Sequence, residues 1–315
     1  MWFLNSANSV CPECSRGCSV RMDAYKGELL RLVPRDNPKV NGPWMCDYGR
    51  LLTERIKDTQ LVARPRIRGA EGWMAYTWDT FAGKLVERTA PYAGKAAQNM
   101  GFVLSGRMTL EEMDAFKVLS ASLFDGAKGT ALNVTRGEDD DLLIRREKRP
   151  NLKGARLLDI EVGGENAPVS GLLKGKKAAF IVREDVMGEA EGDEKERLKA
   201  LLSGMDLVIV ADHNFTETAE LAHVFIPLAG WHEMEGTTVN FLGVAQKTAR
   251  AAVPPKERRP FFDVVSRWLA AAGLESPEPT FLAWQARVKD FIPALKGKMI
   301  RDFLPHGISL EEVMP

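Results

Sequence analysis

The stretch CPECSRGC, residues 11–18, and the tripeptide WMC, residues 44–46, contain all four cysteines of this 315-residue chain. The cysteines follow the spacing C-x2-C-x3-C-x27-C and are Cys11, Cys14, Cys18 and Cys46. Thiolates are soft ligands, and four of them on one short segment can hold one [4Fe–4S] cube or one zinc ion. Pro12 and Gly17 allow the tight loop on which the first three sulfurs would converge. The pattern therefore predicts a metal centre near the N-terminus.

The residues between the third and fourth cysteines predict a small β-rich domain over this centre. Apolar and polar residues alternate over residues 20–24, as in a half-buried strand. A turn at Lys26-Gly27 leads into a returning strand at residues 28–33. The expected divisions of the chain are a cluster-binding domain at 1–62, a linker at 64–69 and a second domain at 63–315.

The cysteine spacing favours an iron–sulfur cluster over zinc. Zinc sites usually combine two short segments that each carry two cysteines, or they include histidine. Here three cysteines lie close together in sequence and the fourth is distant from them. The first histidine of the chain is His213, far from the cysteines in sequence. A zinc staple is kept as the alternative. A disulfide framework is disfavoured because nothing in the sequence points to an oxidising compartment.

Residues 63–315 alternate between apolar strand candidates and amphipathic helix candidates. Strands are expected at residues 100–105, 178–183, 207–211 and 224–227. Helices are expected from residue 78 to near Pro91, and at 109–123, 194–202, 261–272 and 281–295. The helix at 109–123 is expected to begin with a capping box from Thr109 to Glu112. Residues 126–168 are expected to be rich in loops. Continuous apolar strands between helices are typical of a parallel sheet covered on both faces, so the expected fold class is α/β.

Composition and charge exclude several classes of protein. Lys+Arg and Asp+Glu number 43 each, so no net charge draws the chain to nucleic acid. Residues 1–70 hold 12 basic and 7 acidic residues, a surplus that would suit an acidic redox partner. No apolar run approaches the ~20 residues of a membrane-spanning helix, and no secretory signal opens the chain. We expect a cytoplasmic protein without direct membrane insertion, held peripherally at the membrane only through partner subunits.

Two polar groups have competing interpretations. His213, His223 and His232 lie close in sequence, but spacings of 10 and 9 match no metal motif, so ordinary loop histidines are favoured. The acidic run at 138–141 is followed by basic residues at 145–149, and a self-paired surface loop is the favoured interpretation. Neither a G-x-G-x-x-G motif nor a Walker A loop is present, so no dinucleotide or nucleoside triphosphate site is indicated.

Aromatic residues flank the fourth cysteine. Trp44 precedes Cys46 by two residues, and Tyr48 follows it by two. We expect both, with Trp2, to shield the metal centre from water, which tunes the reduction potential of a cluster. For Trp44, ordinary core packing is an equally good and compatible interpretation.

Several segments resemble the molybdopterin oxidoreductase superfamily. SVCPECSRGCSVRMDAYKGELLRLVPRDNPKVNGPWMCDYGR, residues 9–50, resembles its iron–sulfur domain, and the closest likeness is to the G subunit of NADH-quinone oxidoreductase, respiratory complex I. LVIVADHNFTETAELAHVFIPLAGWHEMEGTTVNFLG, residues 207–243, is similar to a block of its sheet domain. Shorter likenesses are WDTFAGKL at 78–85, SGRMTLEEM at 105–113 and LLIRREKRPNLKGARLL at 142–158.

The resemblance implies a reduced doubly wound domain of the molybdopterin oxidoreductase type. The family enzymes that carry molybdopterin are far longer, and their thiolate metal ligand has no counterpart here because all four cysteines are already used. Where many of them have a lysine two residues after the fourth cysteine, this chain has Tyr48. The segment from Asn240 to Gln246 also loses the acidic and basic residues of the family pattern. We therefore expect no molybdopterin.

The same resemblance implies one [4Fe–4S] cluster on the four cysteines and a role as an electron-transfer or scaffold subunit. The expected setting is a complex I-like NADH dehydrogenase with flavin- and iron–sulfur-bearing partner subunits, in which the chain is not catalytic alone. The chain is expected to lack the ferredoxin-like N-terminal region of the complex I protein that it resembles. Two alternatives stay open: the same module in a soluble NAD-linked hydrogenase or formate dehydrogenase, or a structural scaffold stapled by its metal.

Overall fold

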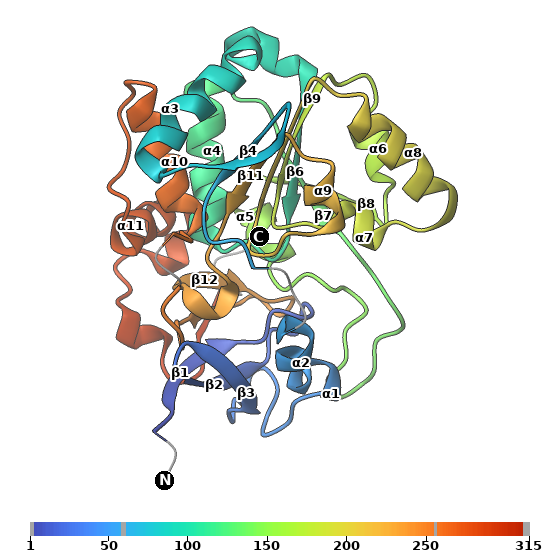
Figure 1. Cartoon of the computed structure of the whole chain (residues 1–315). Coiled ribbons are helices and arrows are strands. Elements are labelled where there is room, and N and C mark those ends of the chain that lie inside the picture. The colour runs from blue at the N-terminus through green and yellow to red at the C-terminus, as the bar shows by residue number, and fades with distance from the viewer. Residues whose placement is uncertain (1–2, 58–60, 255–256, 311–315) are drawn as a thin grey trace.

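The N-terminal part of the chain is an antiparallel β-meander followed by two short helices. The computed structural model describes residues 3–57, 61–254 and 257–310. The meander consists of β1 (Asn5–Val10), β2 (Ser19–Tyr25) and β3 (Glu28–Pro34), and the helices are α1 (Asp47–Arg50) and α2 (Leu52–Lys57). Lys26 and Gly27 both have positive φ and form the predicted turn between β2 and β3. Figure 1 shows this part in blue beneath the rest of the molecule.

The second part is built on an eight-stranded sheet among the described residues, in the order β5-β4-β11-β10-β9-β6-β7-β8. The strands are β4 (Arg66–Gly69), β5 (Gly72–Ala75), β6 (Met100–Ser105), β7 (Thr130–Asn133), β8 (Glu161–Glu165), β9 (Ala178–Val182), β10 (Leu207–Asp212) and β11 (Val224–Pro227). The six from β11 to β8 are parallel. The chain runs outward from β6 to β8, then from β9 to β11 on the other side. This is the doubly wound topology that the sequence predicts.

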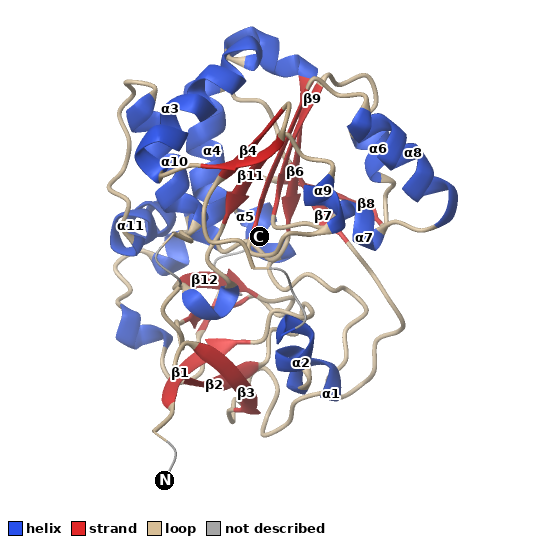
Figure 2. Ribbon diagram, viewed as in Figure 1, coloured by secondary structure: helices blue, strands red, loops and turns tan. Residues whose placement is uncertain are grey.

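Helices cover both faces of this sheet, as Figure 2 shows. On one face lie α3 (Trp78–Thr89), α4 (Leu110–Leu123), α5 (Leu152–Leu157), α10 (Phe261–Ala271) and α11 (Phe281–Phe291); on the other lie α6 (Val169–Leu172), α7 (Val186–Glu189), α8 (Gly192–Ser203) and α9 (Glu217–Glu220). Adjacent residues of β9 point to opposite faces: Phe180 packs with Trp268 of α10, and Ile181 packs with Leu198 of α8. The strands are therefore apolar on both sides, which is why they are visible as unbroken runs in the sequence.

Several sequence predictions need correction. The segment 64–69, predicted as a linker, contains β4, which pairs antiparallel with both β5 and β11. The loop-rich prediction for 126–168 missed β7, α5 and β8. The helix predicted at 281–295 ends at Phe291, because Pro293 cannot continue it and begins a 3₁₀ turn. The predicted capping box is confirmed: Thr109 Oγ1 accepts from the Glu112 N–H, and the Glu112 carboxylate accepts from the Thr109 N–H.

A third sheet, of β12 (Gly236–Val239), β13 (Val244–Thr248) and β14 (Ile308–Ser309), joins the two parts. The Gln246 side chain on β13 accepts from Ser19 Oγ at 2.7 Å and donates to the Gly17 carbonyl at 2.7 Å. The remaining elements are the 3₁₀ turns Ala90–Tyr92, Gly94–Asn99, Trp231–Glu233, Pro293–Leu295 and Ile300–Phe303. The domain boundary at 62/63 stays a prediction. Among the described residues, no helix is long and apolar enough to cross a bilayer.

Asp23 on β2 is buried among charged partners. Its carboxylate accepts from Arg21 Nε at 2.9 Å, from Arg31 Nε at 2.7 Å and from Ser6 Oγ at 2.7 Å. Burial acts to raise the pKa of Asp23, but the hydrogen bonds from Arg21, Ser6 and Arg31 outweigh it and lower the pKa to about 2. A folded-state pKa below the unfolded value of about 3.9 stabilises the fold above that pH, and the stabilisation is lost as the pH falls toward 2.

We therefore expect Asp23→Asn to lower the free energy of unfolding at pH 7 by about 1–2 kcal/mol. This range is smaller than the full pKa shift implies, because both arginines are half exposed and solvent screens their charges. Near pH 2 the wild-type and variant proteins should unfold at the same urea concentration. Asp36→Asn, at an exposed position after β3, is the matched control and should change neither value. An equal loss of stability at both pH values would contradict this account.

Candidate metal centre

The first three cysteines lie on a closed loop between β1 and β2. Because Val10 and Ser19 are paired at the end of the β1–β2 ladder, Cys11 and Cys18 follow directly as neighbours, and the Cys11 N–H donates to the Cys18 carbonyl at 2.8 Å. Gly17, with φ of +58°, turns the chain so that its N–H donates to the Cys14 carbonyl at 3.1 Å. Cys11 and Cys18 are buried, whereas Cys14 is partly exposed.

Cys46 returns to this loop through a turn that Asn41 organises. The buried Asn41 side chain accepts from the Ser19 N–H at 2.8 Å and donates to the Trp44 carbonyl at 2.9 Å. It thereby ties the segment that carries Cys46 to the first residue of β2. Sequence reasoning did not single out Asn41, because an Asn-Gly-Pro tripeptide predicts a turn and not its partner.

Helix α1 presents backbone, without a side chain, to two of the thiols. Cys46 immediately precedes α1, and Gly49 lies one turn into it. A Cβ on Gly49 would stand 2.9 Å from Met45 Cε, 3.0 Å from Cys11 Sγ and 3.9 Å from Cys46 Sγ. Glycine therefore lets helix α1 pass close to these two sulfurs, where a larger residue would collide with its neighbours.

The thiols also influence one another electrostatically. Burial raises the pKa of Cys11, Cys14 and Cys18, with Cys18 reaching about 12. Negative charge on Cys14 and Cys46 raises the pKa of Cys18 further. These groups hold protons at neutral pH unless a metal replaces the protons, and metal–thiolate bonding is what deprotonates such buried thiols.

The exposures of the nearby aromatic residues contradict the predicted shielding. Trp44 is 61% exposed and Tyr48 is 51% exposed, so neither covers the thiols nor packs in the core. Trp2 lies outside the described residues. Aliphatic side chains take this place: Met45 and Leu52 are buried with Cys11 and Cys18 in one apolar cluster. Amphipathic aromatics flanking a ligand are a weak signal of shielding, because a short helix can turn them outward.

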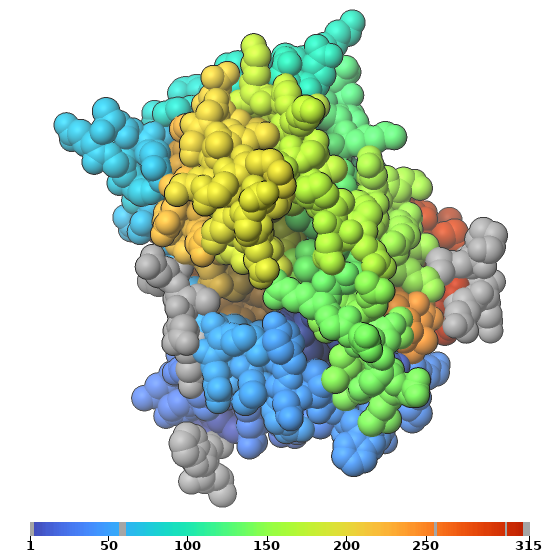
Figure 3. Space-filling model, turned by 90° about the vertical axis from the view of Figure 1, so that its right-hand side faces the viewer, coloured from blue at the N-terminus to red at the C-terminus, as the bar shows by residue number. Residues whose placement is uncertain are grey.

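A cavity of about 540 Å³ separates the cysteine loop from the large sheet. It opens at the carboxyl ends of β6, β9 and β10, beside the point where the winding of the sheet reverses, which is where doubly wound folds bind ligands. Glu13 and Arg55 of the N-terminal part form the opposite wall. Figure 3 shows this face hollowed between the yellow and blue parts of the chain.

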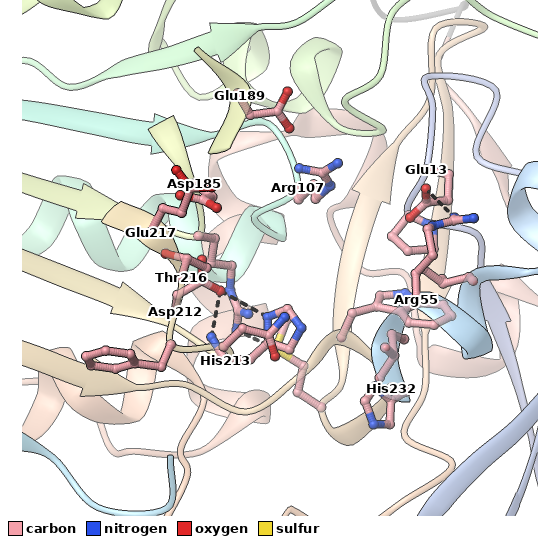
Figure 4. Close-up of a pocket in the computed structure, with 18 of the residues that line it drawn as sticks. Glu13, Arg55, Arg107, Asp185, Glu189, Asp212, His213, Thr216, Glu217 and His232 are labelled. Carbon is pink, nitrogen blue, oxygen red and sulfur yellow. Dashed lines mark hydrogen bonds and ion pairs between the residues drawn. The ribbon is translucent and has the colours of Figure 1, made fainter. Parts of the chain in front are cut away.

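Most charges in the cavity are already paired. Figure 4 shows Arg55 bonded to Glu13 and His213 bonded to Asp212, at 2.9 and 3.0 Å. Arg183, at the end of β9, forms a buried ion pair with Glu112 at 2.7 Å. The carboxylates that line the cavity are Glu13, Asp185, Glu189, Asp212, Glu217 and Glu220, against the guanidinium groups of Arg55, Arg107 and Arg183. The lining is therefore richer in negative than in positive groups.

The three histidines are only partly brought together. His213 and His232 line the cavity, whereas the Nδ1 atom of His223 accepts from the Val208 N–H at 3.0 Å. Burial, with the charges of His213 and Arg258, lowers the pKa of His232 to about 4. Among the described residues, no three Cys, His, Asp or Glu side chains are grouped to hold a single metal ion. This absence applies to a site for a single metal ion. The four thiolates of a [4Fe–4S] cluster bind four different irons and therefore stand further apart.

Family models match both parts of the chain. Residues 4–58 match the molybdopterin oxidoreductase Fe4S4 domain, and residues 152–270 match molybdopterin oxidoreductase. The G subunit of NADH-quinone oxidoreductase from Streptomyces coelicolor is 28% identical over 39% of this chain and 14% of its own length. The same protein of Yersinia pestis is 27% identical over 60% of this chain and 20% of its own length. The chain thus spans a small fraction of these relatives.

A solved structure supports the fold at lower sequence identity. Acetylene hydratase from Pelobacter acetylenicus is similar with a TM-score of 0.57 and 11% identity, covering 96% of this chain and 74% of that one. These matches confirm the fold class that the sequence predicts. They also confirm its resemblance to molybdopterin oxidoreductases and to the G subunit of NADH-quinone oxidoreductase. The first family match supports an iron–sulfur cluster in the N-terminal part.

Proposed function

We propose that this chain, which joins a molybdopterin oxidoreductase Fe4S4 domain to a sheet of the molybdopterin oxidoreductase fold, is an electron-transfer and scaffold subunit of a complex I-like NADH dehydrogenase. In this proposal Cys11, Cys14, Cys18 and Cys46 hold one [4Fe–4S] cluster. The rest of the chain is a platform for flavin- and iron–sulfur-bearing subunits at the cytoplasmic face of the membrane. The chain has no catalysis of its own.

The proposal is supported by the match of residues 4–58 to an Fe4S4 domain and by the approach of two cysteines, distant in sequence, to one helix. Cys11 and Cys46, 35 residues apart in sequence, face the same turn of α1 at Gly49. An all-thiolate donor set suits the soft irons of a cluster, and each buried thiolate gains a metal in place of its proton. A bound cluster supplies one-electron transfer. The protein's part is to hold the ligands and to exclude water with Met45 and Leu52.

The charges of the cavity support the proposed absence of molybdopterin. A pterin dinucleotide carries a pyrophosphate, which needs free cationic groups or helix N-termini. Here Arg183 is committed to Glu112 and to the Ala229 carbonyl, and Arg55 is committed to Glu13. Among the described residues, Arg107 lies 3.8 Å from its ion-pair partner Glu184, so it is the least tightly paired of the three arginines. The cavity therefore offers a pyrophosphate one loosely held guanidinium in place of a cluster of free cationic groups.

Two alternatives use the same site. A soluble NAD-linked hydrogenase or formate dehydrogenase could contain this module, and the subunits that co-purify with the chain would distinguish that setting from a complex I-like one. A structural role is favoured by the apolar cluster around the thiols, in which Cys11 and Cys18 pack with residues from β2 and β3. In that case the metal would only hold the strands of the β-meander together.

Metal analysis and low-temperature EPR of the anaerobically purified chain test the proposal. We expect about four irons per chain and a cubane signal after dithionite reduction, because all four ligands come from one chain. Extraction of the same protein, expressed with molybdate, should yield no guanine dinucleotide. Stoichiometric zinc without a signal would make the chain a stapled scaffold, and recovery of the dinucleotide would refute the proposed absence of pterin.

A further inference from the structure

An arm of residues 134–148 reaches from the end of β7 to the cysteine loop. Its two legs are held together by the Lys148 N–H on the Val134 carbonyl at 2.8 Å and by the Arg136 N–H on the Arg146 carbonyl at 2.9 Å. At the tip, the Asp140 carboxylate accepts from the N–H groups of residues 142, 143 and 144. The arm is therefore an ordered structure, although it has almost no regular strand or helix. Figure 1 shows it in green, descending beside α2.

The arm is docked on the cysteine loop by three kinds of contact. The Ser15 N–H donates to the Glu147 carbonyl at 2.9 Å. The Arg16 guanidinium donates to the carbonyls of Leu142 and Leu143 at 3.0 and 3.2 Å. Leu143 is 6% exposed and packs in the same apolar cluster as Cys11 and Cys18, whereas Leu142 beside it is 66% exposed. The predicted self-paired surface loop is thus paired at its tip, but its inner side packs against the cysteine loop.

We propose that the arm 134–148 is the cover of the metal centre. The inference rests on the proposed function, because it requires a cluster on the four cysteines. The hydrogen bonds from Ser15 and Arg16 hold the arm on the cysteine loop, and they keep the buried side chain of Leu143 beside Cys11 and Cys18. An apolar side chain in this position excludes water from the ligands of a cluster, which protects the cluster from loss of iron.

The test is the rate at which iron is lost to a strong ferrous chelator. Leu143→Ser replaces the buried anchor of the arm and should speed iron release several-fold, because water and chelator reach the thiols. Leu142→Ser makes the same change at the exposed neighbour and should release iron at the wild-type rate. Equal rates in the two variants would mean that the arm is no cover. A wild-type chain without iron would instead refute the proposed function itself.

Discussion

Replacing Cys46 with alanine is expected to reduce the iron content from about four atoms per chain to well under one and to abolish the reduced EPR signal. Three of the four proposed ligands would remain in Cys46→Ala, and a [4Fe–4S] cluster would lack a thiolate for its fourth iron. The bonds that stabilise the buried, otherwise protonated thiols would then be lost together, because each depends on the same inorganic group.

A neighbouring substitution provides the control. Tyr48→Phe lies two residues further along the same helix, at an exposed position, and removes only a hydroxyl. It should keep the full iron content and signal. If Cys46→Ala kept both as well, Cys46 would not be a ligand and the proposed ligand set would be wrong. If iron were lost while partner turnover continued in the assembled complex, the structural alternative would be favoured.

Arg149→Met is expected to lower the free energy of unfolding in urea by about 3–5 kcal/mol. Arg149 is fully buried and donates to both carboxylate oxygens of Glu184, with a further bond to Glu189 at 3.3 Å. Burial acts to lower the pKa of Arg149, but the charge of Glu184 outweighs it and raises the pKa. Methionine would leave the Glu184 carboxylate buried with only Arg107 nearby, at 3.8 Å. An uncompensated buried charge is far costlier than a lost surface pair.

Arg146→Met tests this reasoning with the same change of side chain. Arg146 pairs with Glu165 at 2.8 Å, and both side chains are about half exposed, so its loss should cost no more than about 1 kcal/mol. The double variant Arg149→Met/Glu184→Leu should recover much of the stability, since it removes the charge that the single variant leaves behind. Equal losses in Arg149→Met and Arg146→Met would contradict the account.

The parts of the fold that the sequence predicts are those in which local pattern and tertiary environment agree. The strands β6, β9, β10 and β11 are buried on both faces and were located within one residue of their ends. The strand β4 was missed because Arg66 and Arg68 flank its only buried residue, a pattern that a linker shares. The glycine-rich β8 and the two-residue β14 have no apolar pattern at all.

The candidate site likewise has one part that the sequence predicts and one part that it does not. The cysteine spacing indicates that four thiols meet, because the ligands are encoded in one segment. The segments that contact the cysteine loop were not predictable, since residues 142–148 and Gln246 are distant in sequence and reach it only through the tertiary fold. The orientation of Tyr48 was predicted wrongly for the related reason that a helix of one turn has no periodicity from which a buried face can be deduced.

The joining of the cysteine loop to Gln246 on β13 has a consequence for synthesis of the protein. The loop leaves the ribosome about 230 residues before the strand that closes over it, which at roughly 5–20 residues per second is an interval of about 10–50 s. Until β13 has been made, the loop lacks the two hydrogen bonds that Gln246 forms with Gly17 and Ser19. The order of the chain thus means that the cysteine loop reaches its final set of contacts only after most of the chain has been synthesised.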